Sequence, residues 1–173
     1  NVNSINALLK VLEEPNDNIF FILINNNKKI LPTLKSRCLN YKIVLSFDQS
    51  IRTVNKLIND DIHNLINKEL LCYYSTPGKL LQLISFGNEF KIDLKNISLK
   101  DLISLIINDK YFKKVNSVKE LTYYLIELYF RSTISLKNIQ LLNLYNLFVK
   151  KIDNTRKFNL DDEAIFIEFS ESI

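Results

Sequence analysis

The scarcity of glycine and proline is the feature that most limits what this chain can fold into. Its 173 residues include two glycines and three prolines. Tight hairpins between antiparallel strands depend on turn residues such as Gly and Asn-Gly pairs. We therefore predict a mostly helical fold, in which the 47% of hydrophobic residues supply a core.

The first 45 residues depart from this helical pattern and predict a partial α/β unit. Helical spacing of apolar residues indicates a helix over 4–14, which ends at Pro15 because a residue before proline disfavours the helical region. Ile19–Ile24 is a short run of apolar β-branched and aromatic residues, typical of a buried strand in a parallel sheet. A short helix over 29–37 and an alternating strand over 39–45 follow. Together these elements make half of an α/β sheet.

Residues 46–87 predict a small bundle of three short helices. Ser46 and Gln49 have the spacing of a capping box, which satisfies backbone donors at a helix start. Apolar stripes at helical spacing follow, the last of them after Pro77–Gly78. Residues 87–97 are predicted to be a linker.

Residues 98–173 predict a four-helix C-terminal domain. Caps or acidic first turns indicate helix starts at Ser98–Asp101, Ser117–Glu120, Ser135 and Asp161–Glu163. The second helix should extend through about residue 132. It carries a cluster of aromatic residues, namely Tyr123, Tyr124, Tyr129 and Phe130. Such rings can stack on nucleic-acid bases, but their helical spacing favours a place in the core or in a subunit interface.

Composition and charge narrow the classes of function. The net charge is +4, with basic and acidic residues interspersed, which is too weak to predict nucleic-acid binding by itself. Cys38, Cys72 and the single His63 do not have the spacing of a zinc site, so no metal is expected. We find no apolar run of transmembrane length, no signal peptide and no phosphate-binding GxxxxGK loop. The chain begins with Asn1 rather than Met, so we expect a fragment.

Three consecutive segments carry a family resemblance. They are Asn6–Pro15 (NALLKVLEEP), the apolar run Ile19–Ile24 and Leu31–Cys38 (LPTLKSRC). In this order and spacing the chain resembles the AAA+ clamp loaders of bacterial DNA polymerase III, and the first segment is similar to the delta-prime type. The resemblance implies the C-terminal half of an AAA+ parallel sheet in residues 1–45. It also implies a helical lid in 46–87 and a helical collar for oligomerisation in 98–173.

The resemblance assigns roles to three residues. Arg37 falls in the Ser-Arg-Cys motif, whose arginine reaches the ATP of a neighbouring subunit as an arginine finger. Asn25 falls near the first sensor position, and Lys79, in Ser75–Lys79 (STPGK), near the second. Each residue also has an ordinary alternative: a surface arginine, a turn asparagine after a strand, and a lysine at a helix start. Glu13 and Glu14 suit the polar face of a helix better than paired catalytic carboxylates.

The function implied by the resemblance is that of a delta-prime subunit in a five-membered ring. The ring has three ATPase subunits of the gamma/tau type and a delta subunit, and it loads the sliding clamp onto primed DNA. This fragment would bind no cofactor, with ATP held by its neighbour, and it would act in the cytoplasm without membrane contact. It would belong to the DNA-directed DNA polymerase holoenzyme, a nucleotidyltransferase, without necessarily being catalytic alone. The alternatives are a gamma/tau-type ATPase subunit and a helical scaffold protein without nucleotide chemistry.

Overall fold

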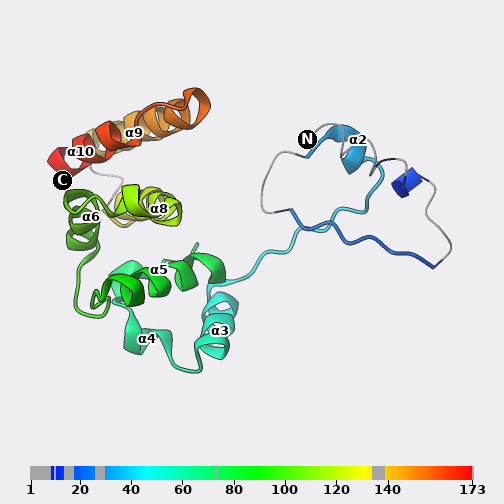
Figure 1. The fold of residues 1–173 in the computed structure, drawn as a ribbon, viewed down its shortest axis with the longest axis horizontal. Helices are drawn as coiled ribbons and strands as arrows, with labels where there is room; N and C mark the ends of the chain where they lie inside the picture. Colours follow the sequence, from blue (N-terminus) through cyan, green and yellow to red (C-terminus); the bar gives the residue numbers. More distant parts are fainter. Residues whose placement is uncertain are drawn as a thin grey trace. The chain divides into compact units, whose positions relative to one another are not determined.

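The computed structural model describes residues 9, 11–13, 18–25, 30–72, 74–133 and 139–172, without the side chain of residue 156. The chain divides into two compact units, Asn1–Val44 and Leu45–Ile173. Each unit is described by itself. The chain is mostly helical, as its composition predicts, and Figure 1 labels the helices.

Within Asn1–Val44, the helix whose bounds are described is α2 (Pro32–Lys35), which begins with a proline in its first turn. Residues 9 and 11–13 are helical, and the rest of the helix predicted over 4–14 lies outside the described residues. Helix α2 is also shorter than the helix predicted over 29–37. A Leu31–Lys35 backbone hydrogen bond of 3.0 Å marks its first turn.

The two predicted strands of this unit are not confirmed. Residues 19–25 and 39–46 lie outside any helix, and no described residue of the chain belongs to a strand. Exposure nevertheless alternates along Ile19–Ile24, with 42–47% for one set of side chains and 87–91% for the other. A strand needs a backbone partner as well as a suitable pattern, because its hydrogen bonds are made between strands. The described residues show no such ladder, so the AAA+ sheet stays a prediction.

The second unit begins with α3 (Phe47–Ile58), and the capping box predicted at its start is confirmed. The Ser46 backbone N–H donates to Gln49 Oε1 at 2.8 Å, and the Gln49 N–H donates to Ser46 Oγ at 3.2 Å. The helix ends at Asn59, whose φ of 55° is left-handed. Its buried face includes Ile51 and Val54 of the predicted apolar stripe, whereas Leu57 is 61% exposed.

Helices α4 (Ile62–Leu65), η1 (Lys68–Leu70) and α5 (Pro77–Phe90) follow. The prediction of a linker over 87–97 is wrong. Helix α5 continues to Phe90, and the following turn folds back so that Leu94 is only 5% exposed. The Asn67 backbone N–H donates to the Leu94 carbonyl at 2.8 Å. This packing is possible because Gly87 on α5 has no side chain in the space that Leu94 occupies.

Five more helices follow among the described residues: α6 (Leu99–Asn108), α7 (Tyr111–Lys114), α8 (Asn116–Thr133), α9 (Ile139–Phe158) and α10 (Asp162–Ser172). The Ser98 cap is confirmed, since its hydroxyl accepts the Asp101 N–H at 3.1 Å. Ser117 is not a cap, because α8 begins one residue earlier and Ser117 lies in its first turn. Ser135 lies outside the described residues, and the short α7 is not predicted by any pattern above.

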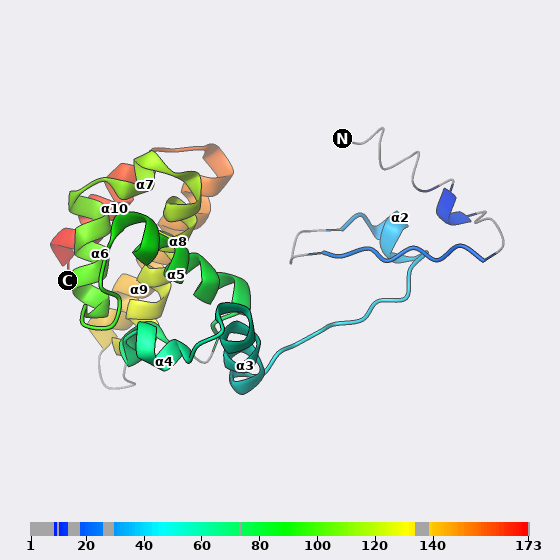
Figure 2. The ribbon, with the colours of Figure 1, turned by 60° about the horizontal axis from the view of Figure 1, so that its bottom comes forward.

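The described residues of Leu45–Ile173 share one hydrophobic core. Helix α8 lies between α5 on one side and α9 with α10 on the other, while α3 and α4 lie at the opposite end of this unit from α10 (Figures 1 and 2). Phe130, Phe148 and Phe169 are almost fully buried, with ring centroids 5.5–5.7 Å apart. The aromatic cluster of α8 therefore contributes to the core, as its spacing favours. The division of this unit into a lid and a collar stays a prediction.

Acidic residues at the start of α10 are bound by lysines from neighbouring helices. Glu163 accepts hydrogen bonds from Lys113 at 2.5 Å and forms an ion pair with Lys110 at 3.0 Å. Asp162 pairs with Lys119 at 2.9 Å. The hydrogen bond from Lys113, followed by that from Lys110, lowers the pKa of Glu163. These pairs attach α10 to α7 and α8.

The close contact at Gly87 generates a stability prediction. A methyl group there would lie 2.6 Å from Leu94 Cδ1. Gly87→Ala should therefore lower the free energy of unfolding by about 1–2 kcal/mol, because crowding outweighs the gain in helix propensity. Gly78→Ala is the matched control on the same helix. It meets no atom within 4 Å and should be neutral or stabilise by up to about 1 kcal/mol. Equal effects in urea unfolding would contradict the packing described here.

The lowered pKa of Glu163 generates a pH prediction. A carboxyl whose pKa falls on folding stabilises the fold above its unfolded value, about 4.3, and loses that contribution as the pH falls further. Glu163→Gln should therefore have a lower Tm than the parent chain at pH 7. The difference should shrink below about pH 4.3. Glu89→Gln, at an exposed position on α5, is the control and should change Tm little at either pH. A Glu163 effect that persists undiminished at pH 3 would rule out this linkage.

Candidate functional site

Arg37 is held at the end of α2 by two contacts within its own unit. Its Nη1 donates to the carbonyl of Thr33 at 2.8 Å, and its Nη2 forms an ion pair with Glu13. Ser36, at the C-cap of α2, also donates to the Thr33 carbonyl, at 3.0 Å. The Arg37 side chain is 35% exposed and that of Glu13 is 47% exposed. The guanidinium is thus oriented by the chain but still reaches the surface.

The ion pair joins two of the segments that carry the family resemblance. Glu13 belongs to Asn6–Pro15 and Arg37 to Leu31–Cys38, so the motifs that are separate in sequence meet in space. An exposed pair of this kind contributes at most about 1 kcal/mol. The two contacts use two of the five N–H donors of a guanidinium. The remaining donors have the planar arrangement that suits a phosphate group.

The other two predicted site residues have different surroundings. Asn25 is exposed at the end of the apolar run, within Asn1–Val44. Lys79 lies in the first turn of α5, where its backbone N–H donates to Thr76 Oγ1 at 3.4 Å. The Lys79 ammonium donates to Gln82 at 3.2 Å and lies 5.8 Å from the centre of the Tyr124 ring. Arg37 and Asn25 belong to one unit and Lys79 to the other, so each is described within its own unit.

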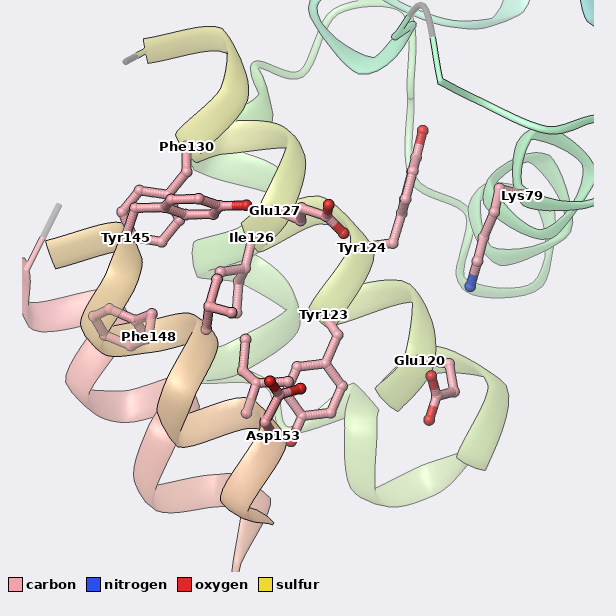
Figure 3. Close-up of a pocket in the computed structure, with 12 residues that line it drawn as sticks. Lys79, Glu120, Tyr123, Tyr124, Ile126, Glu127, Phe130, Tyr145, Phe148 and Asp153 are labelled. Atoms are coloured by element: carbon pink, nitrogen blue, oxygen red, sulfur yellow. The ribbon is translucent and has the colours of Figure 1, made fainter. Parts of the chain in front are cut away.

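A cavity of about 300 Å³ between α5, α8 and α9 was not predicted from the sequence. Figure 3 shows Lys79 from α5 beside Tyr124 from α8, with Asp153 from α9 near Tyr123. Its lining combines apolar, aromatic and charged side chains from three helices. These residues are Lys79, Glu120, Tyr123, Tyr124, Ile126, Glu127, Phe130, Tyr145, Phe148, Val149, Ile152 and Asp153. Periodicity shows which face of a helix is apolar, but it does not show which faces meet. The sequence feature that could have pointed to this cavity is the i, i+7 spacing of Glu120 and Glu127, which places both on one face of α8.

Tyr124 joins this cavity to the start of α5. The Tyr124 hydroxyl lies 2.5 Å from Ser75 Oγ. Ser75 Oγ also accepts the backbone N–H of Cys72, at 3.1 Å. Ser75 is only 2% exposed. Burial raises the pKa of the Tyr124 phenol, and the hydrogen bond with Ser75 opposes part of that shift. This hydroxyl pair is therefore a partly buried contact between segments distant in sequence.

The described residues also bear on whether the chain holds a metal site or a membrane-spanning helix. Within it, no group of three or more His, Cys, Asp and Glu side chains is arranged to hold a metal ion. Cys38 and Cys72 are both free thiols and half-buried. His63 is exposed on α4. Among the described helices, none combines the length and the apolar character needed to cross a membrane.

Comparison with known proteins supports the motifs of the first unit. Residues 1–46 match the family model described as DNA polymerase III, delta subunit. Subunit delta' of DNA polymerase III from Buchnera aphidicola (subsp. Schizaphis graminum) is 29% identical over 164 residues, which is 88% of this chain. Subunit delta' from Pseudomonas aeruginosa is 54% identical over 39 residues, or 22% of this chain. The chain is therefore similar to DNA polymerase III subunit delta' of two bacteria.

The similarity extends to a second kind of subunit. The gamma subunit of DNA polymerase III from the same Buchnera is 32% identical over 115 residues, or 66% of this chain. The matched regions cover 49% of the Buchnera delta' subunit, 27% of the gamma subunit and 12% of the Pseudomonas delta' subunit. The chain thus spans about half the length, or less, of the curated relatives it matches. No solved structure matches it.

Proposed function

We propose that this chain is part of a delta-prime-type clamp-loader subunit and that Arg37 acts as an arginine finger toward ATP bound by a neighbouring subunit. The observation that carries the proposal is that the Arg37 side chain is both oriented and partly exposed. The Thr33 carbonyl and Glu13 orient the guanidinium, which remains partly exposed and keeps donors for another acceptor. Similarity to delta' subunits supports this assignment.

The chemistry of the guanidinium suits this role. An arginine is always charged, and its planar fork matches the oxygens of a phosphate. In phosphoryl transfer, negative charge is spread over the transferred group and stabilised by such a finger. The ion pair with Glu13 is weak enough to be exchanged for a phosphate in an assembled ring. The chain would contribute this one group to hydrolysis at a neighbour's site and would not be catalytic alone.

The proposed partners follow from the same relatives. We infer contacts with gamma-type and delta clamp-loader subunits, and with the sliding clamp and primed DNA through the assembled ring, in the cytoplasm. Sensor-like roles for Asn25 and Lys79 are the less supported part of the proposal. The Lys79 ammonium already contacts Gln82 and the Tyr124 ring, so its position favours a role inside its own chain.

A gamma-type ATPase subunit is the second candidate, favoured by the similarity to a gamma subunit over 115 residues. The two candidates differ in whether the full-length protein binds nucleotide by itself. Equilibrium binding of ATP to the purified full-length protein separates them. Tight magnesium-dependent binding would favour the gamma type, and its absence the delta-prime type.

Arg37→Ala in the full-length protein tests the finger. Fingers of this kind contribute roughly 10³-fold or more to hydrolysis at their own site. The steady-state ATPase rate of the reconstituted ring should fall by less than this, because sites served by other subunits keep their fingers. Folding should be intact, since substitutions of exposed residues usually change stability by less than about 0.5 kcal/mol. Unchanged ATPase and clamp-loading rates, with the ring intact by gel filtration, would remove Arg37 from the mechanism.

Three further variants sharpen this experiment. Arg37→Lys keeps the charge but loses the fork, so it should restore little of the lost rate. Glu13→Gln breaks the ion pair but keeps the guanidinium, so it should retain most of the ATPase rate. Arg52→Ala removes an exposed arginine from α3 and is the matched control, with no expected effect. A loss in Glu13→Gln as large as that in Arg37→Ala would mean that the ion pair itself is what the ring requires.

A further inference from the structure

Two adjacent tyrosines of α8 reach the starts of two different helices. The Tyr124 hydroxyl lies 2.5 Å from Ser75 Oγ, directly before the N-cap of α5, which is Thr76. The Tyr123 hydroxyl donates to the carboxylate of Asp162, in the first turn of α10. One short stretch of α8 thus makes polar contacts with segments 49 and 39 residues away in the sequence.

The contact at Ser75 lies where a lost hydrogen bond is costly. Ser75 is almost fully buried, and its oxygen already accepts the N–H of Cys72, which closes the turn leading into α5. Removing the Tyr124 hydroxyl would leave the buried Ser75 hydroxyl without this partner. A buried polar group without a partner destabilises its surroundings more than an exposed one.

Two further contacts join the first turns of α5 to α8. The Lys79 ammonium lies 5.8 Å from the Tyr124 ring centre, close enough for an attraction between the cation and the ring face. The Gln82 side-chain amide donates to the carbonyl of Ser117, in the first turn of α8. Figure 3 shows the Tyr124 ring between α8 and the Lys79 side chain. The start of α5 is therefore fixed to α8 at three points.

We propose that Tyr124 is a positioning residue that fixes residues 74–79, and with them the Lys79 ammonium, to α8. Tyr123 does the same for the start of α10. Helix α8 then couples the two helix starts, so that a displacement of α8 moves both. The proposal concerns contacts within Leu45–Ile173 and does not depend on the proposed function.

Amide hydrogen exchange resolved by segment tests the proposal, because local opening is reported separately from global unfolding. In Tyr124→Phe, amides of residues 72, 74–76 and 78–80 should exchange about 5- to 150-fold faster, the range expected when a buried hydroxyl loses its partner. Exchange in residues 160–165 should stay unchanged. Tyr123→Phe should give the reverse pattern, with faster exchange at the start of α10 only.

The controls separate positioning from a general loss of stability. Tyr129→Phe makes the same change on the same helix, in a ring packed against Phe130 and Phe169, and should alter neither segment. Ser75→Ala should accelerate the same amides at least as much as Tyr124→Phe, because it also removes the acceptor of the Cys72 N–H. The double variant should be no faster than Ser75→Ala. Uniform acceleration at all amides, additive effects in the double variant, or no acceleration at residues 74–76 and 78–80 would each overturn the proposal.

A second experiment separates the effect of the Tyr124 ring on Lys79 from that of the hydroxyl. It measures, by mass spectrometry, how fast an acylating reagent modifies Lys79. Tyr124→Phe keeps the ring, so the acylation rate of Lys79 should stay near that of the parent chain. Tyr124→Leu removes the ring and should raise the acylation rate of Lys79 severalfold. The exposed Lys91, at the C-cap of α5, is the internal reference, and its rate should not change. Equal Lys79 reactivity in the two variants would show that the ring does not position the ammonium.

Discussion

Burial of the long helix α8 is the constraint on which the second unit depends. Eight of its 18 residues are buried, and they lie on several sides of the helix rather than along one stripe. One side packs toward α5, where Leu80 and Leu83 are fully buried, and another toward the ring cluster with Phe148 and Phe169. A helix covered on several sides has few directions in which it can shift. Polar contacts from its surface therefore fix the elements that they reach.

Capping residues in the sequence predicted two helix starts correctly. The Ser46–Gln49 capping box and the Ser98 cap were found because all the groups that make them lie within one turn of the chain. The linker prediction over 87–97 failed for the opposite reason. The contact that organises this segment joins Leu94 to Gly87 and to Asn67, and no local pattern encodes it. The turn that follows α5 packs against the core without being helical.

The first unit shows the same division between local and distant interactions. The alternation along Ile19–Ile24 follows from the chain itself, but a strand needs a neighbour with which to exchange hydrogen bonds. Motif spacing directed attention to Arg37, and helical periodicity placed Glu13 on a polar face. Neither indicated that the two would pair across 24 positions. The cavity lined by α5, α8 and α9 was missed because helical periodicity does not give the mutual rotation of helices.

The two cations singled out by the motifs have environments that suit different roles. Arg37 is partly exposed, and its partner Glu13 is exposed as well, so solvent screens their attraction and exchange of the carboxylate for a phosphate costs little. Lys79 is half-buried, its ammonium contacts groups of its own unit, and its backbone N–H donates to the hydroxyl of Thr76, the N-cap of α5. Withdrawing that ammonium toward an external ligand would give up the contacts with Gln82 and the Tyr124 ring at once. The physical surroundings therefore favour Arg37 for contact with a neighbouring molecule and Lys79 for holding α5 against α8.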